Sequence, residues 1–152
     1  MSSEDAFRVI DLSLHRFSCS QILALMALEA QERSAPDVVR AMSGLVAGCG
    51  AGKLCGALTG GCCVLGMYAG KGSSEEQEDT RFPLMLSQLV EWFENQYGLQ
   101  YGGIDCSAII QDDAKLKMTR CPQIVAETLA KVQDILAENE YDLAQCPTPG
   151  QG

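Results

Sequence analysis

Apolar residues recur at intervals of three and four along most of the chain, which is the spacing of one face of an α-helix. The first such face is formed by Phe7, Ile10, Leu14 and Phe17. The segment CSQILALMALEAQE predicts a second helix, with Ser18 as its N-cap and Gln21 completing a capping box. Ser34 and Pro36 predict the start of a third helix, PDVVRAMSGLVA, which carries proline at its first position.

Residues 54–70 form an uncharged segment of 17 residues that follows a glycine-rich turn, GCGAGK, and contains five glycines. This length is at the short limit for a membrane-spanning helix, but large apolar side chains are sparse, so we expect a buried helix instead. Gly56 and Gly60 lie four residues apart, and small residues at this spacing let another helix or a cofactor approach closely. Because that other helix could belong to a second subunit, we also consider a homodimer.

The second half of the chain alternates between polar segments and amphipathic helices. Residues 71–80, KGSSEEQEDT, predict an acidic surface loop. A helix that ends before Gly98 is then indicated by Leu86, Leu89, Val90, Phe93 and Tyr97. After the turn YGGID, Asp105 is expected to cap a short helix, CSAIIQ, and Pro122 to occupy the first position of the last long helix.

The chain shows no internal repeat and no β-alternation, so its pattern predicts an all-α fold. We expect a compact bundle of about five to six helices, several of them short. Residues 1–145 are assigned to a single helical domain, and residues 146–152 to a disordered tail.

Composition narrows the possible partners and the compartment. The 152 residues carry a formal net charge of −9, which argues against nucleic acid and against anionic membrane surfaces. The N-terminal segment has no export-signal pattern, so we expect a cytoplasmic protein. Structural disulfides are rare in that compartment, so the eight cysteines are expected to bind metal, to be redox-active or to pack in the core.

Four cysteines fall at the starts of predicted helices on four separate segments: Cys19, Cys55, Cys106 and Cys121. Helix N-termini have unpaired N–H groups and a partial positive charge, which would lower the pKa of a cysteine there. Thiolates ligate metals and attack disulfides. Four such helix starts in one place would suit an iron–sulfur cluster, because the N–H groups can donate hydrogen bonds to sulfur.

The other cysteines and polar residues give weaker indications. We expect Cys62, Cys63 and Cys146 to serve packing alone, whereas Cys49 could be an alternative ligand or a resolving thiol. The chain has no C-x-x-C motif, which argues against a thioredoxin-type dithiol and ordinary zinc ribbons. His15, the single histidine, is expected to face solvent, and the GCGAGK turn lacks the spacing of a phosphate-binding loop.

Cys19, the block CGALTG at residues 55–60, and single cysteines at 106 and 121 resemble the C_GCAxxG_C_C family of redox-active proteins. The resemblance covers most of the chain. It implies that Cys19, Cys55, Cys106 and Cys121 form the functional set, with Gly56, Ala57 and Gly60 as its tightly packed support. A similar module accompanies haem in split-Soret cytochromes, where it implies an iron–sulfur centre.

Three hypotheses follow from these observations. In the first, the four cysteines hold an iron–sulfur cluster, [2Fe–2S] in our expectation, and the protein passes single electrons to a partner oxidoreductase. In the second, the protein is a cluster-free thiol–disulfide oxidoreductase or redox sensor, with Cys55 as the attacking thiol. In the third, zinc on the same cysteines stabilises a helical module that binds a partner.

Overall fold

The computed structural model describes residues 2–145, and this part is built from helices joined by turns and loops. The all-α fold predicted from the sequence is confirmed. The helices of seven residues or more are α1 (Ser3–Leu14), α2 (Cys19–Ala30), α3 (Pro36–Met42), α4 (Gly56–Ala69), α5 (Phe82–Phe93) and α8 (Ala114–Glu138). Two shorter helices are α6 (Leu99–Tyr101) and α7 (Cys106–Ile110). The predicted tail at 146–152 lies outside the described residues.

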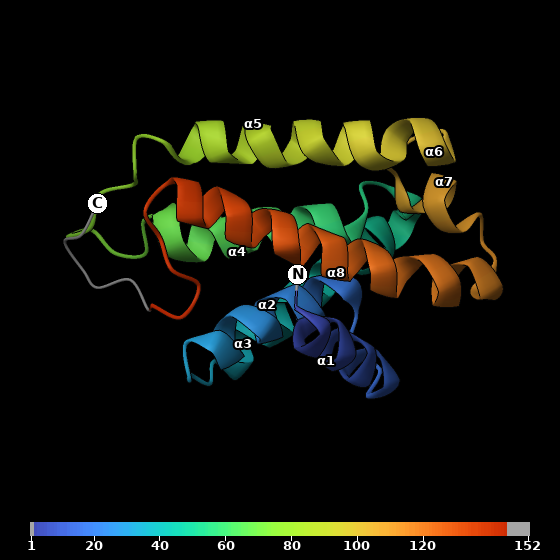
Figure 1. The fold of residues 1–152 in the computed structure, drawn as a ribbon, viewed down its shortest axis with the longest axis horizontal. Coiled ribbons are helices and arrows are strands. Elements are labelled where there is room, and N and C mark those ends of the chain that lie inside the picture. The colour runs from blue at the N-terminus through green and yellow to red at the C-terminus, as the bar shows by residue number, and fades with distance from the viewer. Residues whose placement is uncertain (1, 146–152) are drawn as a thin grey trace.

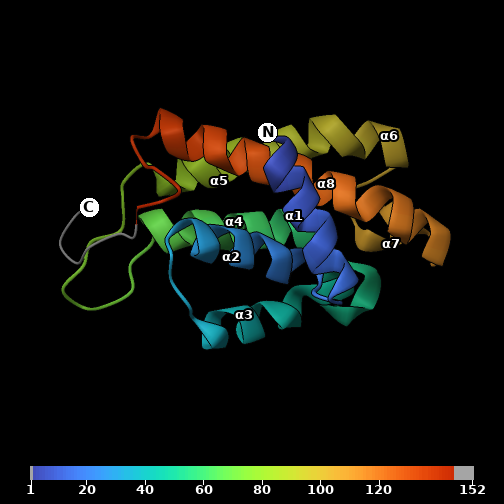
Figure 2. The ribbon, with the colours of Figure 1, turned by 60° about the horizontal axis from the view of Figure 1, so that its bottom comes forward.

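Helix α4 occupies the centre of the molecule, where it contacts α2, α5 and α8 (Figure 1). Helices α1, α2 and α3 lie on one side of α4, and α5 lies on the other (Figures 1 and 2). None of the helices within residues 2–145 is long and apolar enough to cross a membrane. The buried helix predicted in the uncharged segment is confirmed, because nine of the 14 residues of α4 are buried.

The glycines of α4 allow close packing against helices of the same chain. A Cβ atom on Gly60 would lie 2.8 Å from the Ser20 Cα atom of α2. A Cβ atom on Gly61 would lie 3.0 Å from the Leu89 side chain of α5. Such distances leave no room for a methyl group, so the predicted close approach is present. On the Gly60 side the close neighbour is α2 of the same chain. This packing therefore gives no support to the homodimer considered from the sequence.

Helix α1 forms as predicted but turns a different face to the core. Val9 and Leu12 are buried, whereas Phe7, Ile10 and Leu14 are exposed, Leu14 to 77%. A bidentate contact between the Arg8 guanidinium and the Glu29 carboxylate of α2 fits this rotation, with one N–O distance of 2.6 Å. The expectation that Phe7, Ile10 and Leu14 mark the packed face was wrong, because the helix carries a second apolar pair.

Three helix boundaries also differ from the prediction. Helix α3 ends at Met42 and is followed by a 3-10 turn, Ser43–Leu45. The helix predicted to end before Gly98 continues through a π-helical turn and α6, as far as Gly102 with its positive φ of 77°. Helix α8 begins at Ala114, where the Asp113 carboxylate accepts a hydrogen bond from the Lys115 N–H group. Pro122 therefore lies inside α8, where it cannot donate the usual helical hydrogen bond.

Candidate functional site

A short backbone pairing joins the segments that carry Cys55 and Cys106. Leu54 and Asp105 form an isolated antiparallel bridge. On either side of it, the Cys55 N–H group donates to the Ile104 carbonyl at 3.0 Å, and the Cys106 N–H group donates to the Lys53 carbonyl at 2.7 Å. Two cysteines 51 positions apart in the sequence are thus held side by side at the starts of α4 and α7.

Cys19 reaches the same place because α2 packs tightly against the start of α4. It is the first residue of α2, and the capping predicted there is present, since the Ser18 N–H group donates to Gln21 Oε1 at 3.1 Å. A Cβ atom on Gly56 would lie only 2.6 Å from Cys19 Sγ and 3.1 Å from the Leu45 carbonyl oxygen. The missing side chain of Gly56 therefore makes the space that the Cys19 sulfur occupies.

Cys121 comes from the interior of α8, not from a helix start as predicted. Helix α7 folds back onto α8 through Gln111 and Asp112, which both have positive φ. Arg120 secures this return, because its Nη1 atom donates to the Ile109 carbonyl at 2.7 Å and its guanidinium stacks on the Tyr101 ring. The adjacent residue, Cys121, is thereby turned towards the cysteines on the other three segments.

The four cysteines line one small cavity, and their surroundings are hydrocarbon. Its volume is about 20 Å³, which is room for about one water molecule. The wall consists of Cys19, Cys55, Cys106 and Cys121 with Gly56, Ala57, Ile109, Ile110, Ile124 and Val125. Gly56 and Ala57, predicted as support, belong to this wall, whereas Gly60 lies one turn away against Ser20. No charged side chain takes part in the lining.

Burial sets the electrostatics of the four thiols. It raises the pKa of Cys55 to about 12 and the pKa values of Cys19 and Cys121 to about 11. Repulsion among the cysteines themselves adds to each of these shifts. The pKa of Cys106 is also raised by burial, although the Lys117 ammonium opposes that shift. The expectation of lowered pKa values was wrong, because loss of solvent outweighs the helix N-termini.

The remaining predicted candidates lie elsewhere. Cys62 is half-buried against the core, Cys63 and Cys49 are exposed, and Cys146 is outside the described residues. His15 is exposed and its Nδ1 atom lies 2.9 Å from the Asp11 carbonyl oxygen, so it does not reach the cavity. Cys49 sits in a turn with the left-handed φ of 58°, next to glycines that share this conformation.

The apolar walls of the cavity and the cation near it, Lys117, were not predicted from the sequence. Ile124 and Val125 follow Cys121 by three and four residues, and Lys117 precedes it by four. These are the spacings at which helical residues share a face. These spacings indicate that the four side chains share a helix face, but only if α8 begins before Pro122. Nothing in the local sequence indicates that residues 53–55 pair with residues 104–106.

Comparisons with known proteins agree with the cysteine pattern. Residues 17–135 match the model of the family described as "Putative redox-active protein (C_GCAxxG_C_C)". The matched range includes all four cysteines of the cavity. No curated protein and no solved structure matches the chain.

Proposed function

Because the chain belongs to the C_GCAxxG_C_C family of redox-active proteins, we propose that its redox centre is an iron–sulfur cluster held by Cys19, Cys55, Cys106 and Cys121. The protein would act as an electron carrier for a partner oxidoreductase. The observation that carries this proposal is that four cysteines from four different helices line one cavity with no other polar side chain.

The raised pKa values favour a bound cation over free thiolates. A thiol with a pKa of about 11, like those of Cys19 and Cys121, is ionised in roughly one molecule in ten thousand at pH 7. Buried thiolates would also repel one another. A positively charged metal centre removes both penalties, since it binds the deprotonated sulfurs and neutralises their charge. The site is therefore better suited to ligating metal than to presenting a reactive thiol.

The donor set is four cysteines with no other polar side chain in the cavity wall, and a [2Fe–2S] cluster divides four cysteines between two irons. In the described part of the chain no three His, Cys, Asp or Glu side chains are placed to hold a metal ion, zinc or iron, without movement. A cluster is also larger than the 20 Å³ void, so the side chains that line the cavity would have to move when it binds.

The chain's own groups would hold and shield such a centre. The four cysteines supply thiolate ligands, and Gly56 leaves the space in which the Cys19 sulfur lies. Ile109, Ile124 and Val125 exclude water from one side of the cavity. When bound, the cluster would supply one-electron transfer without chemistry on a substrate.

A thiol–disulfide function is the second candidate, and the position of Cys106 favours it. Cys106 is only partly buried and Lys117 supports its thiolate, whereas Cys55, the attacking thiol predicted from the sequence, is 7% exposed. In this scheme Cys106 and a neighbouring cysteine form one S–S bond and lose two electrons and two protons. A disulfide on a partner is reduced to two thiols in exchange.

Anaerobic purification separates the two candidates. We expect a brown protein with about two irons and two labile sulfides per chain, measured by visible spectroscopy and chemical assay. Cys55→Ser and Cys121→Ser should lose most of this iron, whereas the matched control Cys63→Ser, an exposed cysteine on α4, should retain it.

Two results would contradict the cluster. One is a colourless protein that stays colourless after anaerobic reconstitution with iron and sulfide. The other is a Cys55→Ser variant with its full iron content. If the colourless protein also loses two free thiols on mild oxidation, with Cys106 in the new disulfide by peptide mapping, the thiol–disulfide function takes its place.

A further inference from the structure

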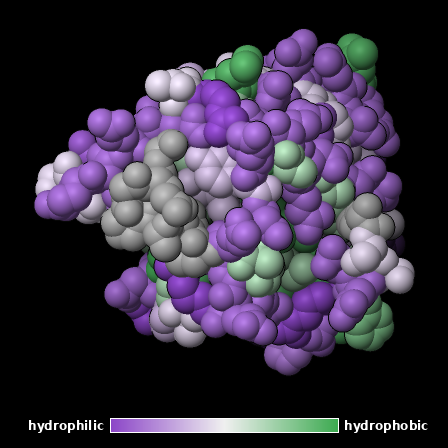
Figure 3. Space-filling model, turned by 60° about the vertical axis from the view of Figure 1, so that its left-hand side comes forward, coloured by the Kyte–Doolittle hydropathy of each residue, from purple (hydrophilic) through white to green (hydrophobic). Residues whose placement is uncertain are grey.

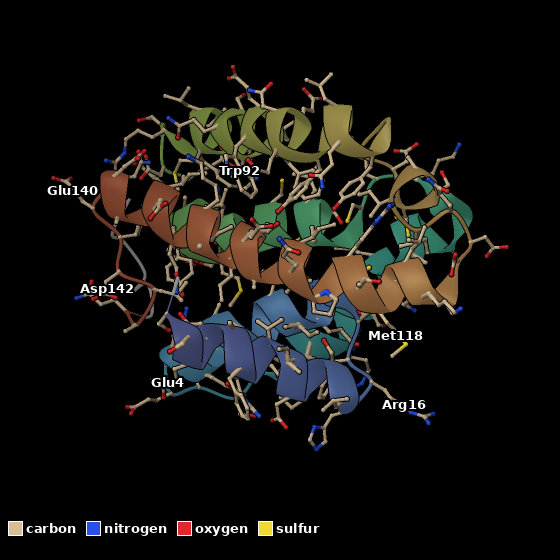
Figure 4. All side chains as sticks on the ribbon, turned by 45° about the vertical axis from the view of Figure 1, so that its right-hand side comes forward. Glu4, Arg16, Trp92, Met118, Glu140 and Asp142 are labelled. Carbon is tan, nitrogen blue, oxygen red and sulfur yellow. The ribbon has the colours of Figure 1, made fainter. Side chains whose placement is uncertain are left out.

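The charges of the chain are separated along its long axis. Residues 14–20, 43–57 and 99–121, which carry the four cysteines of the cavity, hold five of the 11 Lys and Arg residues but only three of the 20 Asp and Glu residues. The rest of the chain therefore has six basic and 17 acidic residues. Figure 4 shows Arg16 and Met118 at one end of the molecule, and Glu140 and Asp142 at the other. The cavity thus lies at the basic end of an acidic protein.

Two lysines on the first turns of α8 contribute unpaired positive charge at this end. Lys115 and Lys117 are exposed, and neither forms an ion pair with any residue of the described range 2–145. Lys117 precedes Cys121 by one helical turn, about 6 Å along the axis. The lysines therefore stand next to the centre.

An apolar side chain is exposed beside these lysines. Met118, 79% exposed, directly follows Lys117 and lies three residues before Cys121 on α8. An apolar centre with a polar rim is the usual composition of a docking surface between proteins, and weak electron-transfer complexes bury a small area. Cys106, only partly buried, places the centre just beneath this surface.

We infer that the surface formed by Lys115, Lys117 and Met118 is the docking site for an acidic protein that exchanges single electrons with the four-cysteine centre. This inference rests on the proposed function. In the forward direction the partner's redox centre loses one electron and is oxidised, and the four-cysteine centre gains it and is reduced. No atom or proton is transferred.

A compact acidic partner fits the charges better than an extended polyanion does. Complementary charge at the contact steers the encounter and orients the two redox centres. Asp105, Asp112 and Asp113 lie at the same end and limit the patch to a small area. An extended nucleic acid or an anionic membrane would also meet the acidic remainder of the chain and be repelled.

The test uses a plant-type [2Fe–2S] ferredoxin, an acidic one-electron carrier, as the probe. Binding to the whole chain is measured by calorimetry at 20 and 200 mM NaCl. We expect binding at low salt that weakens about tenfold at high salt. Lys115→Glu/Lys117→Glu should weaken low-salt binding about tenfold. The matched control Lys71→Glu/Lys131→Glu, with the same change of net charge away from the cavity, should weaken it less than twofold.

No binding at 20 mM NaCl, binding that ignores salt, or equal losses in the two double variants would overturn the docking site. The proposed function is judged separately, by the iron content and by one-electron reduction of the protein with dithionite. Salt-dependent binding through Lys115 and Lys117 without a reducible centre would keep the docking surface and overturn the cluster. A reducible centre without such binding would keep the cluster and overturn the docking surface.

Discussion

The two ends of α4 differ in how their polar groups are satisfied. At the far end from the cavity, the buried Asp79 carboxylate accepts hydrogen bonds from the Arg81 backbone and guanidinium at 2.8–3.1 Å and from the Tyr141 hydroxyl at 2.6 Å. The Asp79 N–H group donates to the Ala69 carbonyl at the last residue of α4. Together, these hydrogen bonds of Asp79 connect α4, α5 and the segment after α8.

At the cysteine end, four like groups face one another and oppose each other's ionisation. Buried groups that raise one another's pKa, with no counter-charge in the cavity wall, are typical of a candidate functional site. The Asp79 carboxylate, by contrast, has its hydrogen-bond partners and its counter-charge in Arg81 and Tyr141. The face of the molecule at that end is largely hydrophilic (Figure 3). The group around Asp79 is therefore structural, whereas the four cysteines form a candidate functional site.

We expect the largest loss of bound iron from a substitution that fills the space beside Cys19. In Gly56→Ala the new methyl group would lie 2.6 Å from Cys19 Sγ and 3.1 Å from the Leu45 carbonyl, so the sulfur has to leave its position. We expect loss of most of the bound iron after reconstitution. Gly44→Ala is the control, since a Cβ atom there has no neighbour within 4 Å. Equal iron in both variants would contradict the role of Gly56.

A substitution in the group formed by Asp79, Arg81 and Tyr141 should lower stability without affecting the cysteine site. Asp79→Asn keeps the shape but removes the charge that Arg81 and Tyr141 contact. Because Arg81 is partly exposed, we expect a loss of about 2 kcal/mol in the free energy of unfolding. Urea titration measures this loss. Iron content per folded chain should equal that of the unmodified protein, and a fall in iron would show that the two ends are coupled.

The same cluster predicts a pH dependence. Hydrogen bonds from Arg81 hold the pKa of Asp79 well below its usual value. A depressed folded-state pKa gives stability that is complete above the unfolded-state value of about 4 and is lost as the pH falls below it. Urea midpoints between pH 6 and pH 2 should therefore fall more steeply for the unmodified chain than for Asp79→Asn. Parallel curves would refute the assignment.

The smallest expected effect concerns the cation beside the cysteines. Lys117 opposes the rise in the pKa of Cys106, so Lys117→Gln should raise that pKa further. In the metal-free protein at pH 8, alkylation of Cys106 by iodoacetamide should slow about twofold. Peptide mass spectrometry follows each cysteine separately. The rate at the exposed Cys63 serves as the internal reference, and an unchanged ratio of the two rates would exclude the effect.

Much of the fold could be predicted because local signals agree with tertiary packing. Ser18 and Gln21 cap α2, and the glycines of α4 need a close neighbour, as their sequence spacing indicates. The start of α8 could not be placed, since Pro122 suits both a first helical position and a tolerated interior one. The rotation of α1 depends on the burial of Val9 and Leu12 against residues that are distant in the sequence.

The candidate site was predictable in its members but not in its chemistry. The helix starts at Cys19, Cys55 and Cys106 could be found from the residues before them. Their burial depends on apolar residues from α7 and α8, and burial decides the sign of the pKa shifts. The bridge between Leu54 and Asp105 joins segments with no local tendency to pair, so only the folded chain reveals that Cys55 and Cys106 are neighbours.

The spread of the four cysteines along the chain has a consequence for biosynthesis. Cys19, Cys55, Cys106 and Cys121 are separated by 36, 51 and 15 positions, and the last of them lies within the longest helix. A nascent chain has no complete site until α8 has left the ribosome and docked. On the proposed function, cofactor insertion must therefore follow folding, and the loaded centre would tie four distant points together and slow the global opening of the protein.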